Sequence, residues 1–423
     1  MHRQHMQDPA GDQGRTNTSH TFPTVSPEQV GLSSAGLERL TAVMQRQVDA
    51  KHVPGVSMLI ARGGKLAYRR DVGALLPGGP PLKDDAIFRI FSMTKPVASV
   101  ALMMLVEEGR LFLSDHLAKF VTEFASPQVG VEKDGKLELV PANRAITIQD
   151  LLRHTSGLAY AFTGNSAVQR LYRRSQLFAP DPANSRTHLV RDLSTAEFVA
   201  ELAKLPLIDQ PGAAWNYSHS TDVLGRVIEV VSGQSLGAFL QARILGPLGM
   251  KDTSFVLAPD KYERVAEPFD VDPDVASKPI ALIAKESRQR FESAGGGLWS
   301  TMDDYARFAR MLYLGGTLDG TRIIGRKTFA FMVSDHLGPN VRNGTPSLLA
   351  PGHGFGLGFC VRLVPGMAST PGTPGEFYWG GLAGTVFWIA PQEELVAMMM
   401  IQAPGQRDYY RQLFRNLVHA ALI

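Results

Sequence analysis

The sequence contains a single cysteine, Cys360. One thiol cannot form a disulfide within the chain, so the fold must be held by packing and hydrogen bonds. This scarcity also favours a reducing compartment, and we expect a cytoplasmic protein. Because Cys360 lies in a strand-like Gly-Phe-Cys-Val context, we interpret it as a core residue rather than a nucleophile.

A strong charge of either sign and a long apolar run are also missing. The 43 basic and 40 acidic side chains leave a formal net charge of +3, and no basic run is interleaved with aromatics, so we expect no nucleic-acid partner. The apolar stretches are too short to span a bilayer, and we expect no membrane segment. Residues 1–25 are polar and lack the apolar core of a signal peptide, which predicts a disordered lead-in.

Motifs for metals and phosphates are absent as well. Eleven histidines occur, but none forms an H-x-x-x-H pair or clusters with carboxylates at ligand spacing, so we expect no metal. The run Gly295-Gly296-Gly297 lacks the flanking strand, lysine and acidic partner of a nucleotide site. We interpret these glycines as a place of tight backbone packing, and we expect no cofactor.

Strand-like runs lie beside a helical pattern at both ends of the chain. The expected elements are a helix at 34–50, strands at 55–62 and 65–68, strands at 385–390 and 395–401, and a helix at 407–421. This arrangement predicts an α+β fold, in which one antiparallel sheet is built from both chain ends and is flanked by helices.

The middle of the chain has few convincing strands. Its clearest helical patterns cover 147–153, 195–205, 221–231 and 236–245, separated by segments rich in proline and glycine. We therefore predict a mostly helical domain over 113–284, inserted into a sheet domain made of 26–112 and 285–423.

A serine and a lysine three residues apart, Ser92 and Lys95, are the first candidates for chemistry. Side chains at i and i+3 share one face of a helix, so the amine can reach the hydroxyl and take its proton. Helically spaced apolar residues follow, and Gly109 supplies a stop signal, which predicts an amphipathic helix that starts at or near Ser92. The serine amide at such a helix start is free to bind developing negative charge.

Two later segments could complete the site. Tyr217 lies in Trp-Asn-Tyr-Ser-His-Ser, between Pro211-Gly212 and a helical pattern, where polar side chains can converge on a cleft. The segment 377–385 reads Phe-Tyr-Trp-Gly-Gly-Leu-Ala-Gly-Thr, and its glycines would let a substrate approach the edge of a strand closely.

These three segments, in this order, resemble the serine hydrolases of the β-lactamase fold. That superfamily includes class C β-lactamases, penicillin-binding proteins and family VIII carboxylesterases. The resemblance runs from about Phe22 to the C-terminus, and the segments 151–158 and 294–301 reinforce it. It implies a β-lactamase-like fold in which Ser92 is the nucleophile, Lys95 its base and Tyr217 the tyrosine of the Y-x-N motif.

The resemblance also implies an oxyanion site and a substrate pocket. The backbone amides of Ser92 and Leu382 match the oxyanion donors, and His219, Trp379, Gly380 and Gly381 match pocket positions. Two of these depart from the penicillin-recognising pattern. His219 stands in place of asparagine, and Trp379 in place of the K-T-G lysine that helps to bind a carboxylate. The departures favour uncharged esters with apolar acyl groups over β-lactams.

We therefore expect a carboxylesterase that hydrolyses small or short-chain esters through a Ser92 acyl-enzyme, with a small-molecule ester as its partner. The alternatives are an acyltransferase that uses the same acyl-enzyme, a weak β-lactamase, and a binding protein that keeps the fold. Whether Lys95 or Tyr217 is the primary base stays open, as does the oligomeric state.

Two rival arrangements need weighing. Ser235 lies in a G-x-S-x-G sequence, but a helical pattern precedes it where a nucleophile elbow requires a strand, so we expect Ser235 to cap a helix. His154 could serve a Ser-His-Asp triad, but its place at the end of a predicted helix favours a structural role.

Overall fold

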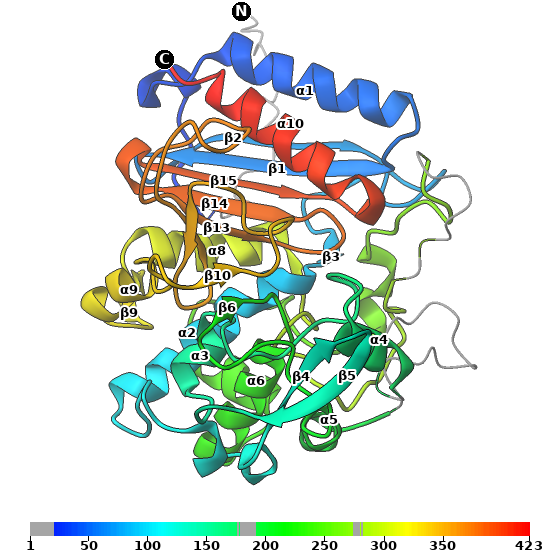
Figure 1. The fold of residues 1–423 in the computed structure, drawn as a ribbon. Coiled ribbons are helices and arrows are strands. Elements are labelled where there is room, and N and C mark those ends of the chain that lie inside the picture. Colours follow the sequence, from blue (N-terminus) through cyan, green and yellow to red (C-terminus); the bar gives the residue numbers. More distant parts are fainter. Residues whose placement is uncertain (1–20, 176, 178–191, 274–279, 281) are drawn as a thin grey trace, which may run out of the picture.

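The computed structural model describes residues 21–175, 177, 192–273, 280 and 282–423 (Figure 1). Its largest sheet has seven strands in the order β11-β12-β13-β14-β15-β1-β2, and all neighbours are antiparallel. The strands are β1 (Gly55–Arg62), β2 (Lys65–Gly73), β11 (His353–Phe355), β12 (Cys360–Arg362), β13 (Phe377–Gly380), β14 (Val386–Ala390) and β15 (Leu395–Met400).

The two chain ends meet inside this sheet. The first strand, β1, pairs with the last, β15, with Ile60 opposite Ala397. Both strands are almost wholly buried and rich in apolar residues, as expected for strands covered on two faces. The predicted antiparallel sheet built from both termini is confirmed.

Helices cover both faces of the sheet. On one face lie α1 (Ser34–Asp49) and α10 (Arg407–His419), the blue and red helices of Figure 1, and on the other lies α8 (Met302–Tyr313). The core under α1 and α10 includes Trp388 and Phe414, while the opposite core continues into the helical part of the molecule. This layering anchors the strands that border the site.

In the segment between the two sheet-forming regions, most of the regular secondary structure is helical, and long loops join the helices. Its helices are α3 (Ile148–Leu152), α4 (Ala167–Arg174), α5 (Thr195–Leu202), α6 (Ser220–Ser232), α7 (Leu236–Leu240) and the π-helical turn η5 (Gln241–Leu245). It also contains a hairpin that we did not predict, formed by β4 (Gln128–Lys133) and β5 (Lys136–Pro141). The four helices predicted from the sequence are present as α3, α5, α6 and α7 with the turn η5, and this segment also contains a two-stranded sheet.

The remaining described elements are short or connect the two parts. They are α2 (Thr94–Glu107), α9 (Arg326–Met332), β3 (Ile87–Arg89), β6 (Ala214–Trp215), β7 (Trp299–Thr301), β8 (Thr317–Leu318), β9 (Thr321–Arg322) and β10 (Arg342–Asn343). The 3-10 helices are η1 (Pro27–Val30), η2 (Phe91–Met93), η3 (Leu117–Lys119), η4 (Thr122–Phe124), η6 (Pro259–Arg264), η7 (Pro391–Glu393) and η8 (Pro404–Gln406).

Helix α2 differs from the expected amphipathic helix. Every residue from Thr94 to Leu105 is buried, and the helix packs against α6. The stretch from Val97 to Val106 has only one polar residue, Ser99, so the helix has no polar face to expose. A helix that is apolar all round belongs in a core, and α2 therefore holds the start of the site from inside the molecule.

The prediction of a disordered lead-in is wrong for residues 21–25. Phe22 is buried, and Val25 donates a backbone hydrogen bond of 3.0 Å to Leu66, so residues 21–25 are packed against β2. The rest of that predicted segment, residues 1–20, lies outside the described residues.

Among the described residues, no single helix has both the length and the apolar character needed to cross a membrane. One bent pair, Ser220–Ser232 with Leu236–Leu245, meets the length and composition criteria only when its two helices are taken together across a 76° bend.

Candidate active site

The turn that presents Ser92 is formed by η2, directly before α2. Phe91 adopts a left-handed backbone conformation with φ of 44°, which is uncommon for a residue other than glycine. Such strained positions cluster at functional sites, because the surrounding structure must hold them. Here the turn leaves Ser92 half-buried at the pocket, while Phe91 and Met93 on either side are buried.

Lys95 lies one turn further and is almost fully buried. Its Nζ lies 3.3 Å from Ser92 Oγ, 3.0 Å from Tyr160 Oη and 2.6 Å from the carbonyl oxygen of Gly295. Gly295 and Tyr160 accept two hydrogen bonds from the amine, and Ser92 Oγ lies within reach of its third position. The predicted contact between Ser92 and Lys95 is therefore present in the structure.

Lys95 also contacts Tyr160 and Gly295, which no sequence motif assigned to the site, although the run Gly295-Gly296-Gly297 was expected to be a place of tight backbone packing. Tyr160 is buried, and burial together with the charge of Asp222 raises the pKa of its hydroxyl well above the usual value, so it stays protonated. A Cβ added at Gly295 would lie 2.8 Å from the Asp222 carboxylate and 2.9 Å from Tyr160 Oη. A glycine is therefore needed for this backbone to reach Lys95.

Behind Lys95, Asp222 of α6 holds the Gly295 turn in place. Its carboxylate accepts hydrogen bonds from Ser293 Oγ at 2.6 Å, from the Gly295 amide at 2.8 Å and from His219 Nδ1 at 2.7 Å. Burial alone would raise the pKa of Asp222, but the His219 hydrogen bond and nearby positive charge hold it below the usual value. The buried carboxylate is thus ionised and lies on the far side of Gly295 from the amine.

His219 occupies a different place from the one expected. It was expected in the pocket wall, but it lies behind Tyr160 with the two ring centroids 4.2 Å apart, and it is not among the residues that line the pocket. Burial lowers its pKa although Asp222 opposes this, so the neutral ring donates from Nδ1 to the carboxylate. His219 therefore supports the rear of the site.

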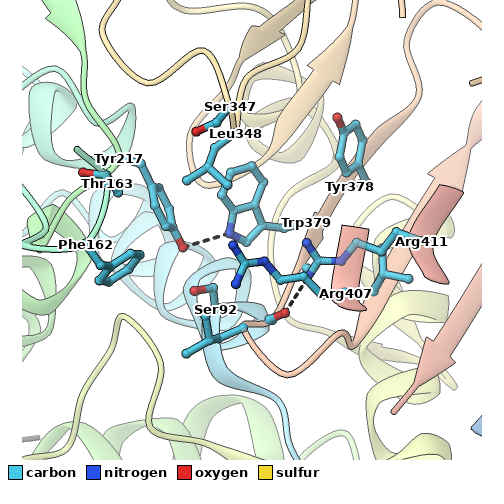
Figure 2. A pocket seen from close by; sticks show the side chains of 14 residues that line it. Ser92, Phe162, Thr163, Tyr217, Ser347, Leu348, Tyr378, Trp379, Arg407 and Arg411 are labelled. Carbon is cyan, nitrogen blue, oxygen red and sulfur yellow. Dashed lines mark hydrogen bonds between the residues drawn. The ribbon is translucent and has the colours of Figure 1, made fainter. Parts of the chain in front are cut away.

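Tyr217 enters the pocket from the segment just before α6. Its ring lies 4.6 Å from Lys95 Nζ, and its hydroxyl accepts a hydrogen bond of 3.3 Å from Trp379 Nε1. Figure 2 shows Tyr217, Trp379 and Ser92 around one pocket, with the tyrosine hydroxyl directed towards the indole. Trp379 thus contributes a donor as well as an apolar wall.

The end of β13 approaches the Ser92 turn closely. A Cβ added at Gly381 would lie 2.3 Å from the Ile90 carbonyl oxygen, and Thr385 Oγ1 donates to that same carbonyl at 3.3 Å. Leu382 follows and lines the pocket together with Ser92. In the described part of the chain, neither the Ser92 nor the Leu382 amide donates a hydrogen bond to another residue. Both amides are thus available for a substrate oxygen.

The pocket itself has a cavity volume of about 170 Å³. Its lining combines aromatic, small and cationic side chains (Figure 2): Ser92, Phe162, Thr163, Tyr217, Ser347, Leu348, Tyr378, Trp379, Gly380, Gly381, Leu382, Val386, Arg407 and Arg411. The predicted Trp379, Gly380 and Gly381 are among these residues. The two arginines, which come from α10, were not predicted.

The rival nucleophiles lie elsewhere. Ser235 Oγ accepts a hydrogen bond from the Ala238 amide at 3.2 Å and caps α7, and helix α6 precedes it as expected. Cys360 is buried in β12, and burial raises the pKa of its thiol to about 12.

His154 is fully buried, and its Nδ1 lies 3.3 Å from Ser218 Oγ. Burial, with a further effect from the charge of Lys95, lowers the pKa of the ring well below 6.5. The ring is therefore neutral and packed beside Tyr217, with its centroid 5.0 Å from the tyrosine ring.

Within the described ranges, no group of three or more His, Cys, Asp or Glu residues could hold a metal ion.

Comparison with known proteins agrees with this arrangement. The Beta-lactamase family model matches residues 40–422. Protein Rv1367c of Mycobacterium tuberculosis is 36% identical over 85% of this chain and 88% of its own length, and Esterase EstB of Burkholderia gladioli is 31% identical over 87% and 91%. Among solved structures, EstCE1, "a hydrolase with promiscuous acyltransferase activity", superposes with a TM-score of 0.72 at 24% identity and covers 91% of this chain and 98% of its own.

Proposed function

The chain belongs to the β-lactamase family and is a serine hydrolase that acts on esters, and from this premise we propose that it hydrolyses small or short-chain carboxylic esters through an acyl-enzyme on Ser92. The observation that carries the proposal is the 3.3 Å contact between the buried Lys95 Nζ and Ser92 Oγ, at the edge of a pocket that Ser92, Tyr217 and Leu382 line. Each group has a role that follows from its place.

In the first step, Ser92 Oγ attacks the ester carbonyl while its proton passes to the pair formed by Lys95 and Tyr217. The carbonyl oxygen becomes an oxyanion and accepts hydrogen bonds from the amides of Ser92 and Leu382. Such preorganised donors are typically worth about 100- to 1,000-fold in rate each. Because Lys95 Nζ keeps its contacts with Gly295 and Tyr160, it is held in place while the proton moves.

In the second step, the tetrahedral intermediate collapses and the ester C–O bond breaks. Tyr217 returns the proton to the departing alkoxide, which leaves as an alcohol. Water then attacks the acyl-enzyme, its proton passes to the same pair, and Ser92 is released with the carboxylic acid. An alcohol that takes the place of water would give acyl transfer, the activity named for EstCE1.

The test is hydrolysis of p-nitrophenyl butyrate by the wild type and by Ser92→Ala, with nitrocefin assayed in parallel. We expect ester turnover that falls at least about a thousandfold in Ser92→Ala, with little nitrocefin cleavage. Ser235→Ala is the matched control, because it removes the serine of the G-x-S-x-G sequence, and its turnover should equal that of the wild type. Turnover that survives in Ser92→Ala would overturn the proposal.

A further inference from the structure

The pocket contains two cationic side chains and no acidic one. Arg407 and Arg411 belong to the first two turns of α10 and line the same cavity as Ser92, and none of the described lining residues is Asp or Glu. The buried indole of Trp379 forms an apolar wall of this cavity, so positive charge there is screened less than in open water.

Arg411 has a structural role. Its guanidinium donates hydrogen bonds to the carbonyl oxygens of Gly381 and Thr385, which hold the glycine segment after β13 in its bent shape. Burial lowers the pKa of Arg411 to about 10, so the group remains charged at neutral pH. Because Nη2 points at the backbone and Nη1 lies 3.7 Å from Asp408 Oδ1, Arg411 contributes charge to the pocket but has fewer free donors for a ligand than Arg407.

Arg407, in contrast, makes few contacts with other polar groups of the described residues. Its nearest carboxylate is that of Asp408, with Nε 3.7 Å from Oδ1, and Asp408 is itself 69% exposed and lies at the same distance from Arg411. With the described residues, the Arg407 guanidinium makes no hydrogen bond. Figure 2 shows its side chain extending from α10 over the pocket, in the direction of Tyr217 and Ser92. The guanidinium thus presents unused N–H donors to the cavity that Ser92 also lines.

We propose that Arg407 forms an anion subsite and that the substrate is an ester that also carries a free carboxylate. A planar guanidinium matches a carboxylate through two parallel N–H···O bonds, which fix orientation as well as adding affinity. The inference rests on the proposed function, because the carboxylate is selected only if the same molecule brings an ester carbonyl to Ser92. It also alters the expectation of uncharged substrates. Trp379 on β13 supplies no charge, but Arg407 on α10 supplies it to the same pocket.

The test compares charged and neutral esters of matched shape. The charged esters are p-nitrophenyl hydrogen glutarate, with the carboxylate on the acyl side, and 4-acetoxybenzoate, with the carboxylate on the alcohol side. Their neutral partners are p-nitrophenyl valerate and 4-acetoxybenzamide. The quantity measured is the ratio of kcat/KM for the charged ester to kcat/KM for its neutral partner, in the wild type, Arg407→Gln, Arg407→Lys and the exposed control Arg46→Gln on α1.

For at least one pair, we expect the ratio to fall about tenfold or more in Arg407→Gln, to fall less in Arg407→Lys, and to stay at the wild-type value in Arg46→Gln. Added salt should lower the wild-type ratio and leave the Arg407→Gln ratio nearly constant. Equal ratios in the wild type and Arg407→Gln for both pairs would overturn the subsite while leaving the esterase intact. Failure of the wild type to hydrolyse any of the four esters would overturn the proposed function and the subsite with it.

Discussion

The two sides of Lys95 are built differently. Behind it lies a buried network, which we call the rear network and define as Tyr160, His219, Asp222 and Gly295, and its polar atoms contact one another or the lysine. In front lies the pocket, where Phe162 is 64% exposed and Arg407 makes no hydrogen bond with the described residues.

This difference separates two tasks. A buried polar network is stable only when its members are satisfied, so the rear network has one arrangement and fixes the amine in it. The pocket has the unused donors of Arg407 and the exposed ring of Phe162, which are open to contact with a substrate. We infer that the rear network determines how well the proton is moved, and that the pocket determines which ester is bound.

The largest effect should come from breaking the link between the two sides. Lys95→Met keeps an unbranched side chain, one heavy atom shorter, and removes the amine, and we expect kcat to fall about a thousandfold or more with a much smaller change in KM. The exposed Lys119→Met is the control and should retain wild-type kinetics. Near-normal turnover in Lys95→Met would mean that the base lies elsewhere.

Asp222→Asn breaks the rear network without touching the pocket. We expect the free energy of unfolding to fall by about 3 kcal/mol, because three donors lose an ionised acceptor, and kcat to fall about 10- to 100-fold as Gly295 and Lys95 shift. Urea unfolding and steady-state kinetics measure the two effects.

Asp304→Asn is the matched control for this experiment. Asp304 is also buried, but it lies on α8, and burial raises its pKa to about 6, so it tolerates a neutral replacement better. We expect wild-type kcat in Asp304→Asn. An equal loss of kcat in both variants would show that the effect of Asp222→Asn reflects general destabilisation.

A smaller effect should follow from Trp379→Phe, which alters the boundary between the two sides. The change removes the Nε1–H that donates to Tyr217 and keeps an aromatic wall. A neutral hydrogen bond of this kind is worth about 1 kcal/mol net, so we expect kcat to fall about fivefold and KM for apolar esters to change little. Trp388→Phe, on the far face of the sheet, should change stability alone.

The sequence predicted much of the pocket but little of the rear network. Ser92 and Lys95 share a helix face at fixed spacing, and Tyr217 and Trp379 lie in segments whose glycines and prolines indicate loops beside a cleft. Tyr160, Gly295 and Asp222 have no such spacing, because they come from three separate segments that only the packing of α6 brings together. Local patterns carry no information about contacts of this kind.

Two other features that the structure revealed, the β4–β5 hairpin and the burial of α2, could have been predicted from the sequence. Asp134-Gly135 has both residues at positive φ, which is the backbone of a two-residue hairpin turn, and this pair between strand-like runs predicts β4 and β5. The uninterrupted apolar character of 97–106 likewise predicts a helix buried on all sides, as α2 is. Which of Arg407 and Arg411 has more free donors depends on backbone carbonyls that no sequence pattern reveals.

The smallest effect concerns the exclusion of water from the rear of the site. The pKa of His154 is near 6.5 when unfolded and well below that when folded, because burial opposes its charge. Its contribution to stability is therefore complete above pH 6.5 and is lost as the pH falls below that value. One such histidine can add at most about 1.4 kcal/mol per pH unit to the slope of the free energy of unfolding against pH. We would measure the free energy of unfolding in urea between pH 7.5 and 5.5. It should depend less steeply on pH in His154→Gln than in the wild type. An equal dependence in both proteins would indicate that water reaches the ring.

The most direct test of the central claim is to identify the residue that becomes covalently modified. A fluorophosphonate reacts with a serine that a neighbouring base has activated, and proteolysis followed by mass spectrometry locates the label. We predict one label on Ser92, strongly reduced in Lys95→Met and retained in Arg407→Gln, because the first variant removes the base and the second alters only ligand binding. A label on another residue, or equal labelling of Ser92 in wild type and Lys95→Met, would contradict the account.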